Sequence, residues 1–134
     1  MNLLTLRKIV CISIGVLVAG AGIAHFTNAD FFTKLVPETL QAHRGAVNAV
    51  TGVIQAAMGL CFLVPMLRAV ARWSTIVLLV VTLPAAIGQV IHPESIEAVG
   101  LMPALAVVRV VAQLLMIGLI WWATKPDASR QANA

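Results

Sequence analysis

Charged residues are scarce in this chain. Asp, Glu, Lys and Arg together make up 10% of its 134 residues, whereas 60% are hydrophobic. Soluble domains average about 25% charged residues, because their surface needs groups that water solvates. The deficit excludes an ordinary soluble domain and indicates an integral membrane protein.

Residue types that bind metals or act as nucleophiles are also few and scattered. Cys11 and Cys61 stand in separate apolar stretches with neither a CxxC nor a metal-ligand spacing, which is typical of small buried hydrophobes. No acidic residue interrupts an apolar stretch, and no two of the three histidines are four residues apart as helical metal ligands would be. The sequence therefore predicts no metal site and no hydrolase, assigns no catalytic residue, and leaves enzymatic activity open.

The apolar residues gather in four stretches, each of the roughly 17–25 residues that an α-helix needs to cross a bilayer. The links between them are short, so neighbouring helices are expected to run antiparallel. The predicted fold is an all-α, integral membrane four-helix bundle that forms one domain over residues 1–134. The first stretch also fits a signal peptide with "AGA" before its cleavage point, but its length favours a span. The predicted spans are residues 7–26, 45–67, 74–92 and 103–123, followed by a short polar tail, residues 124–134.

Basic residues are distributed unevenly between the two sides of this bundle. On the side opposite the termini, Lys34 and Arg44 are offset by Asp30 and Glu38. The positive-inside rule then places both termini in the cytoplasm and predicts a multi-pass protein of the inner membrane. Because the basic residues flank the spans and form no stripe, the predicted partner is the lipid bilayer and not nucleic acid. Six of the nine basic residues lie on the side of the termini: Arg7, Lys8, Arg68, Arg72, Lys125 and Arg130.

The longest link, between the first and second spans, contains an amphipathic stretch, "ADFFTKLVPETL" at residues 29–40. Phe31 and Phe32 would be left in water if this stretch were an exposed loop. We therefore expect it to lie on the outer interface or to fold as a lid over the mouth of the bundle.

Small and polar residues recur at helical spacing in every span, as they do where membrane helices pack together. The alternating steps of three and four residues place each set on one face of its helix. The stripes comprise Gly15, Ala19, Gly22 and Phe26 in the first span, Gly45, Asn48, Gly52, Gln55 and Gly59 in the second, Thr82, Ala85, Gln89 and His92 in the third, and Ala106, Arg109, Gln113 and Met116 in the fourth.

The polar members of these stripes lie in the half of the bundle farther from the termini, where the first span ends beside His25. We expect them to line a polar pocket that opens to the extracytoplasmic side. Alternatively, the amides only link helices, each bond contributing about 0.6 kcal/mol. The candidate ligand-binding residues are Arg109, Gln113, Gln55, Asn48, Gln89, His92 and His25.

Arg109 is the least expected residue within a span. An Arg at the centre of a membrane helix costs about 2.5–3.5 kcal/mol, and Arg109 lies about 9 Å below the outer end of its span. Two compatible interpretations stay open. The guanidinium pairs with a loop carboxylate, from Asp30, Glu94 or Glu97, or it anchors an anionic or carbonyl-bearing ligand.

Four segments carry a recognisable pattern: "AGIAHFTNADFFTKLVP" closing the first span, "VTGVIQAAMGLCFLVPMLR" in the second, "LPAAI" in the third and "RVVAQLLMIGLIWWA" in the fourth. In the order of these motifs the chain resembles the DoxX or DoxX-like family of small four-span membrane proteins. The resemblance covers nearly all of residues 15–122. It implies an inner-membrane protein. Some members of that family are the membrane subunit of a thiosulfate:quinone oxidoreductase or partners in oxidant and thiol stress systems.

Two residues depart from the pattern of that family. Gln55 stands where such proteins usually carry an acidic residue, and Ala86 stands where several have Asn. An intramembrane pair between Arg109 and a glutamate is therefore unavailable, and a neutral pocket is expected.

The predicted function is a redox-associated membrane subunit whose pocket binds a quinone or a similar lipophile. Arg109, Gln113 and Gln55 would address its carbonyl oxygens, while the redox chemistry would come from the quinone, the one candidate cofactor, and a protein redox partner. A homodimer is a further candidate assembly. The alternatives are a non-redox binder or transporter of a small lipophile through the same pocket, and a purely structural membrane subunit.

Overall fold

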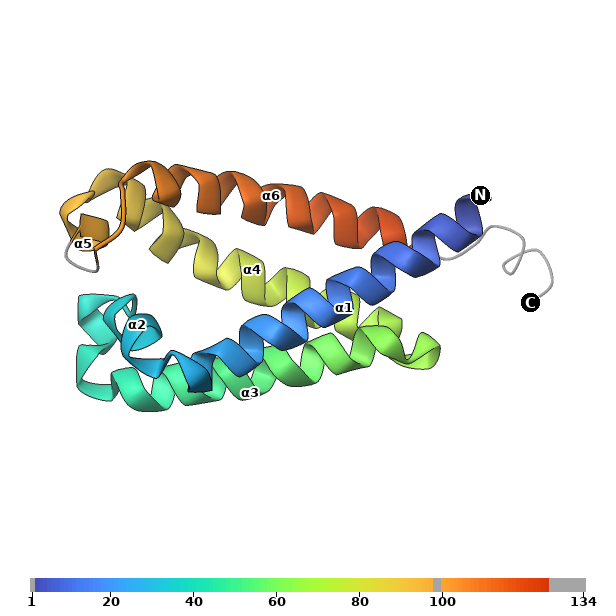
Figure 1. The fold of residues 1–134 in the computed structure, drawn as a ribbon, viewed down its shortest axis with the longest axis horizontal. Coiled ribbons are helices and arrows are strands. Elements are labelled where there is room, and N and C mark those ends of the chain that lie inside the picture. The colour runs from blue at the N-terminus through green and yellow to red at the C-terminus, as the bar shows by residue number, and fades with distance from the viewer. Residues whose placement is uncertain (1, 98–99, 126–134) are drawn as a thin grey trace.

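The computed structural model describes residues 2–97 and 100–125, and these residues are all-helical, without a strand (Figure 1). Four of its segments are long and apolar enough to cross a membrane, which confirms the all-α prediction and its four span-length helices. The long helices are α1 (Leu3–Thr27), α3 (Arg44–Leu63), α4 (Arg68–Ile91) and α6 (Ala104–Thr124). The short ones are α2 (Ala29–Lys34), η1 (Glu38–His43), η2 (Pro65–Leu67) and α5 (Glu94–Glu97).

The long helices form two antiparallel pairs, α1 with α3 and α4 with α6 (Figure 1). The pairs approach each other at the end where α1 begins and α6 ends, and they diverge toward the end that carries α2 and α5. We call these the terminal end and the loop end. Five of the six basic residues predicted to share the side of the termini lie at the terminal end, whereas Arg130 and most of the predicted polar tail lie outside the described residues.

The link between α3 and α4 is shorter than the hydropathy pattern predicts. α3 ends at Leu63 because Pro65 follows, and Val64 adopts the extended conformation that a residue before proline favours, with ψ 113°. α4 then begins at Arg68, so the basic residues that were expected in a loop belong to its first turns. Both arginines of this link are thereby held on a rigid helix.

Glycines bring the backbones of α1 and α3 into direct contact. A Cβ atom added at Gly59 would lie 2.2 Å from the backbone nitrogen of Ala19, and one added at Gly22 would lie 2.3 Å from that of Ala56. Gly52 completes the contact against the backbone oxygen of Gly22. The small-residue stripes of the first two spans therefore do face each other, as close packing of membrane helices requires.

The hydrophobic core lies at the terminal end. It includes the fully buried side chains of Phe62, Ile14, Ile120 and Cys11, which come from α1, α3 and α6. Cys11 is thus buried, with Sγ 3.4 Å from the carbonyl oxygen of Ala123, while Cys61 is half-buried. Because the core occupies this end, the diverging helices of the loop end are left to enclose a cavity.

Candidate functional site

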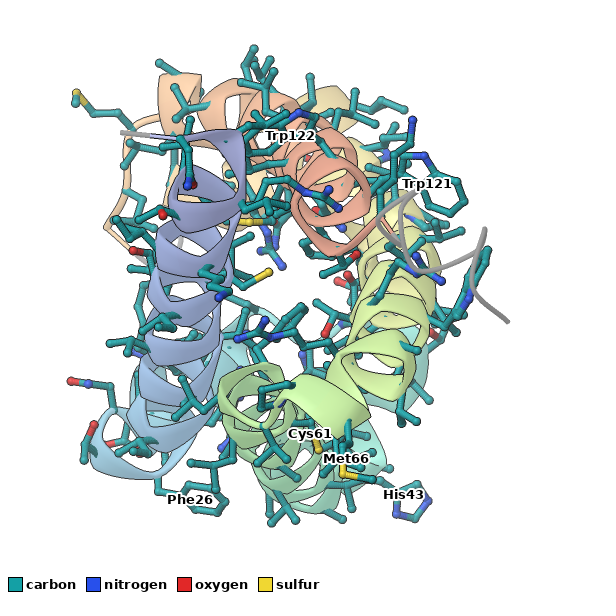
Figure 2. The ribbon with its side chains drawn as sticks, turned by 90° about the vertical axis from the view of Figure 1, so that its right-hand side faces the viewer. Phe26, His43, Cys61, Met66, Trp121 and Trp122 are labelled. Carbon is teal, nitrogen blue, oxygen red and sulfur yellow. The ribbon has the colours of Figure 1, made fainter. Side chains whose placement is uncertain are left out.

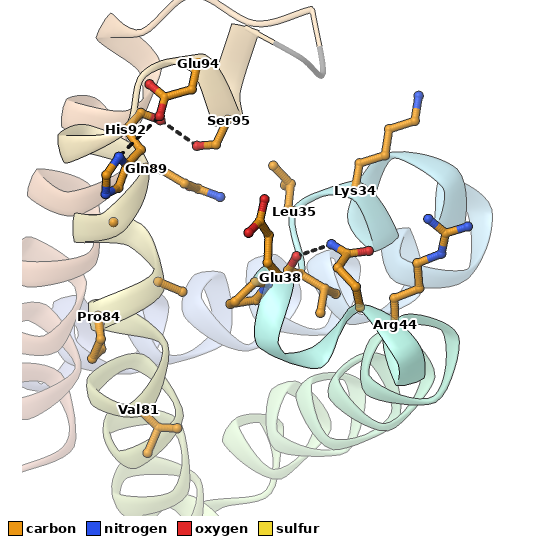
Figure 3. A pocket seen from close by; sticks show the side chains of 15 residues that line it. Lys34, Leu35, Glu38, Arg44, Val81, Pro84, Gln89, His92, Glu94 and Ser95 are labelled. Carbon is orange, nitrogen blue, oxygen red and sulfur yellow. Dashed lines mark hydrogen bonds and ion pairs between the residues drawn. The ribbon is translucent and has the colours of Figure 1, made fainter.

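The loop end contains a cavity of about 1120 Å³ between α4 and the link that joins α1 to α3 (Figure 3). α4 forms one wall, and the link with the first residue of α3 forms the other. The lining residues are Lys34, Leu35, Val36, Pro37, Glu38, Gln41 and Arg44 from the link side, Val81, Pro84, Ala85, Gly88 and Gln89 from α4, and His92, Glu94 and Ser95 beyond it.

The lining changes from apolar to charged along the length of α4. From Val81 to His92 the helix rises by about 16 Å, and its wall is apolar as far as Gly88. Charged groups of both signs line the cavity nearer the loops. An elongated ligand with a polar head toward the loops and an apolar body beside α4 suits this gradient. The charged lining residues are Lys34, Glu38, Arg44 and Glu94.

Gln89 points from α4 into the cavity (Figure 3). It is 7% exposed, and its Oε1 accepts a hydrogen bond from Nη1 of the exposed Arg109 at 2.9 Å. A guanidinium has donors only, so the amide oxygen must face Arg109 and the amide nitrogen must face away from it. That nitrogen has no acceptor among the described residues. The cavity wall therefore holds a free donor with a cation behind it.

Gln113 is bonded within the α4–α6 pair, away from the cavity lining. Its Nε2 donates to Thr82 Oγ1 at 3.0 Å and to the carbonyl oxygen of Leu79. Gln113 is buried, and both acceptors belong to α4. These bonds link two helices and leave no donor of this amide directed at a ligand.

His25 and Asn48 form a closed pair between α1 and α3. Asn48 Nδ2 donates to the carbonyl oxygen of His25 at 2.8 Å, and Asn48 Oδ1 lies 2.7 Å from His25 Nδ1. Since the amide oxygen can only accept, His25 Nδ1 carries the proton in this pair. Phe32 of α2 stacks on the imidazole at 4.0 Å between ring centres, which holds α2 against the end of α1.

These elements correspond to a known domain family. A family described as a domain of unknown function, DUF8561, matches residues 14–125. The chain belongs to this family. The matched range includes every residue that lines the cavity and all the predicted ligand-binding residues. Comparisons with curated proteins and with solved structures found no match.

In this DUF8561 chain, the predicted ligand-binding residues fall into separate groups. Only Gln89 and His92 line the cavity, and Arg109 reaches it through Gln89. His92 is exposed at the mouth, with Nδ1 3.2 Å from Glu94 Oε1. Gln55 is half-buried on α3 and makes no hydrogen bond with a described residue. The helices therefore do not gather these polar groups into the single pocket that was expected.

The loop wall of the cavity was missing from the predicted site. Leu35 and Val36 of the amphipathic stretch line the cavity, and Gln41 Nε2 bonds to the carbonyl oxygen of Val36 at 2.5 Å, which ties the link together. In the sequence, the two adjacent phenylalanines and the alternating charges of residues 29–40 were the signal that this stretch packs against the bundle. Among the described residues, no group of three His, Cys, Asp or Glu side chains could hold a metal ion.

Proposed function

We propose that this DUF8561 protein is a multi-pass protein of the inner membrane with both termini in the cytoplasm. Four span-length apolar helices support insertion. The orientation is supported by the five basic residues of the terminal end, since residues 2–8, 63–75 and 119–125 contain no carboxylate. Trp73 and Trp121 also lie at that end, as indole rings do at a membrane interface. The cavity then opens toward the extracytoplasmic side.

Fusion reporters test this orientation. We expect a C-terminal GFP fusion to fluoresce, because GFP would fold on the cytoplasmic side, and alkaline phosphatase fused at the same point to stay inactive. Alkaline phosphatase inserted in the link between α5 and α6 is expected to be active. A dark GFP fusion that immunoblotting shows to be inserted in the membrane contradicts the orientation.

We infer that the cavity binds the polar head of a membrane-soluble ligand, with a quinone as the candidate. The free amide donor of Gln89, fixed by Arg109, is the observation that carries this inference. A quinone carbonyl is an acceptor and fits such a donor, while the apolar wall of α4 suits the ring and the start of the isoprenoid tail. A volume of about 1120 Å³ is slightly larger than the roughly 300–1,000 Å³ of typical ligand sites, so both parts have room.

In this proposal the protein is a redox-associated membrane subunit. The resemblance to DoxX-like proteins supports this assignment, since some of them belong to quinone-linked complexes. The quinone would supply the electron chemistry together with a protein redox partner, and Gln89 and Arg109 would bind and orient it. No residue of the chain is assigned a catalytic role.

Two observations favour simpler roles for other parts of the polar stripes. The bonds of Gln113 to α4, and those between Asn48 and His25, close on the protein itself, which supports helix linkage as their function. The cavity would equally serve a non-redox carrier of a lipophile, so the identity of the bound molecule distinguishes the two functions.

Co-purification tests the quinone proposal directly. Protein extracted in a mild detergent is expected to carry quinone that organic solvent releases and mass spectrometry identifies, and added short-chain quinone is expected to raise its melting temperature. A different co-purifying lipophile would favour the non-redox carrier. Absence of quinone together with no stabilisation by quinone analogues would refute the proposal.

A further inference from the structure

The terminal end concentrates positive charge at the start of α4. Arg68 and Arg72 lie one turn apart in its first turns, and the first turn has no acidic residue. No side chain caps the helix at Leu67, so the positive end of the helix dipole adds to the field of the two guanidinium groups. The described residues of the terminal end contain no carboxylate that would offset this charge.

The two guanidinium groups are only partly satisfied by the protein. Arg68 Nε donates to the carbonyl oxygen of Phe62 at 3.1 Å, and Arg72 Nη1 donates to that of Thr124 at 3.3 Å. Both Nη atoms of Arg68 and Nη2 of Arg72 have no acceptor among the described residues. Each guanidinium is therefore anchored by one nitrogen and has further donors available for an external oxygen ligand.

Aromatic rings hold Arg72 at the level of the membrane interface. Its guanidinium carbon lies 5.4 Å from the ring centre of Trp73 and 5.2 Å from that of Trp121, and the two indoles contact edge to face. Figure 2 views this end and shows Trp121 on the outside of the bundle. Trp73 is 52% exposed and Trp121 is 42% exposed. The Arg72 guanidinium thus lies beside two exposed apolar rings.

We propose that Arg68 and Arg72 bind the phosphate of an anionic phospholipid headgroup. Phosphate oxygens match the donor geometry of guanidinium groups, and two cations compensate a headgroup that keeps a net negative charge. The exposed indoles of Trp73 and Trp121 beside Arg72 provide contact for the acyl chains, which favours a lipid over free phosphate. This site lies at the opposite end from the cavity and does not depend on the ligand proposed there.

Lipid binding is measured on the full chain in a neutral detergent. Native mass spectrometry with phosphatidylglycerol and with phosphatidylcholine of the same acyl chains is expected to show preferential retention of phosphatidylglycerol. Each removed guanidinium is expected to weaken that binding about fivefold, so R68Q/R72Q should lose most of the preference. R44Q is the matched control, because it removes a cation at the loop end and should leave the preference intact.

Further arms separate the sources and guard against misfolding. Inorganic phosphate at the lipid concentration is expected to neither compete with the lipid nor raise the melting temperature. If R68Q/R72Q does not fold, R68Q alone, whose residue makes a single hydrogen bond to the protein, replaces it. Equal retention of both lipids by the wild type, competition by free phosphate, or an unchanged preference in the Arg68 variants would overturn the proposal.

Discussion

Gly59→Ala is expected to destabilise the helix bundle strongly, and Gly22→Ala should act in the same way. The added methyl at position 59 would lie 2.2 Å from the backbone nitrogen of Ala19, and backbone atoms cannot move aside as a flexible side chain can. α1 and α3 must then separate along their whole contact. Overpacking of this kind costs about 1–3 kcal/mol, and contact with backbone places these variants at the upper end.

The free energy of unfolding in mixed detergent and SDS micelles measures this effect. Gly20→Ala is the matched control on α1, the helix that also contains Gly22, because nothing lies within 4 Å of the added methyl. It should be neutral or slightly stabilising, since alanine favours the helix over glycine. Equal stability of all three variants would mean that α1 and α3 do not pack through these glycines.

Gln89→Glu is expected to abolish most quinone binding while preserving the fold. The carboxylate keeps an acceptor for Arg109, and so the contact between α4 and α6 survives. The donor that faces the cavity is replaced by an anionic acceptor, which repels a carbonyl oxygen. Loss of one hydrogen bond with added repulsion should weaken binding tenfold or more, roughly 1.4 kcal/mol, as measured by calorimetric titration of a short-chain quinone analogue.

Thr82→Val provides the control for Gln89→Glu. It removes another polar contact between the same helices, the one that Gln113 makes with Thr82, but this contact does not line the cavity. Stability should fall by about 0.6 kcal/mol and quinone affinity should not change. Arg109→Leu should insert normally yet lose binding, because it releases the amide of Gln89. Full affinity in both Gln89→Glu and Arg109→Leu would leave these residues as helix links only.

The helical periodicity of the sequence identified the packing faces but not their partners. The glycine stripes of α1 and α3 were predicted from spacing, and they meet in backbone contact. The polar residues behaved differently. They were expected to line one pocket together. Arg109 and Gln113 of α6 do bond to polar residues of the α4 stripe, but Asn48 bonds to His25 and not to them. Every span carries a stripe, so spacing alone could not select which stripe faces which.

Composition and hydropathy by themselves predicted the four span-length helices of the described residues, because each lies in an apolar stretch long enough to cross a bilayer. The tertiary structure decided where a ligand could be held. The cavity exists because the helix pairs diverge at the loop end and because the link between α1 and α3 folds back to form its second wall. The orientation of the Gln89 amide likewise follows from a neighbour twenty residues away in the chain, Arg109, whose guanidinium can only donate.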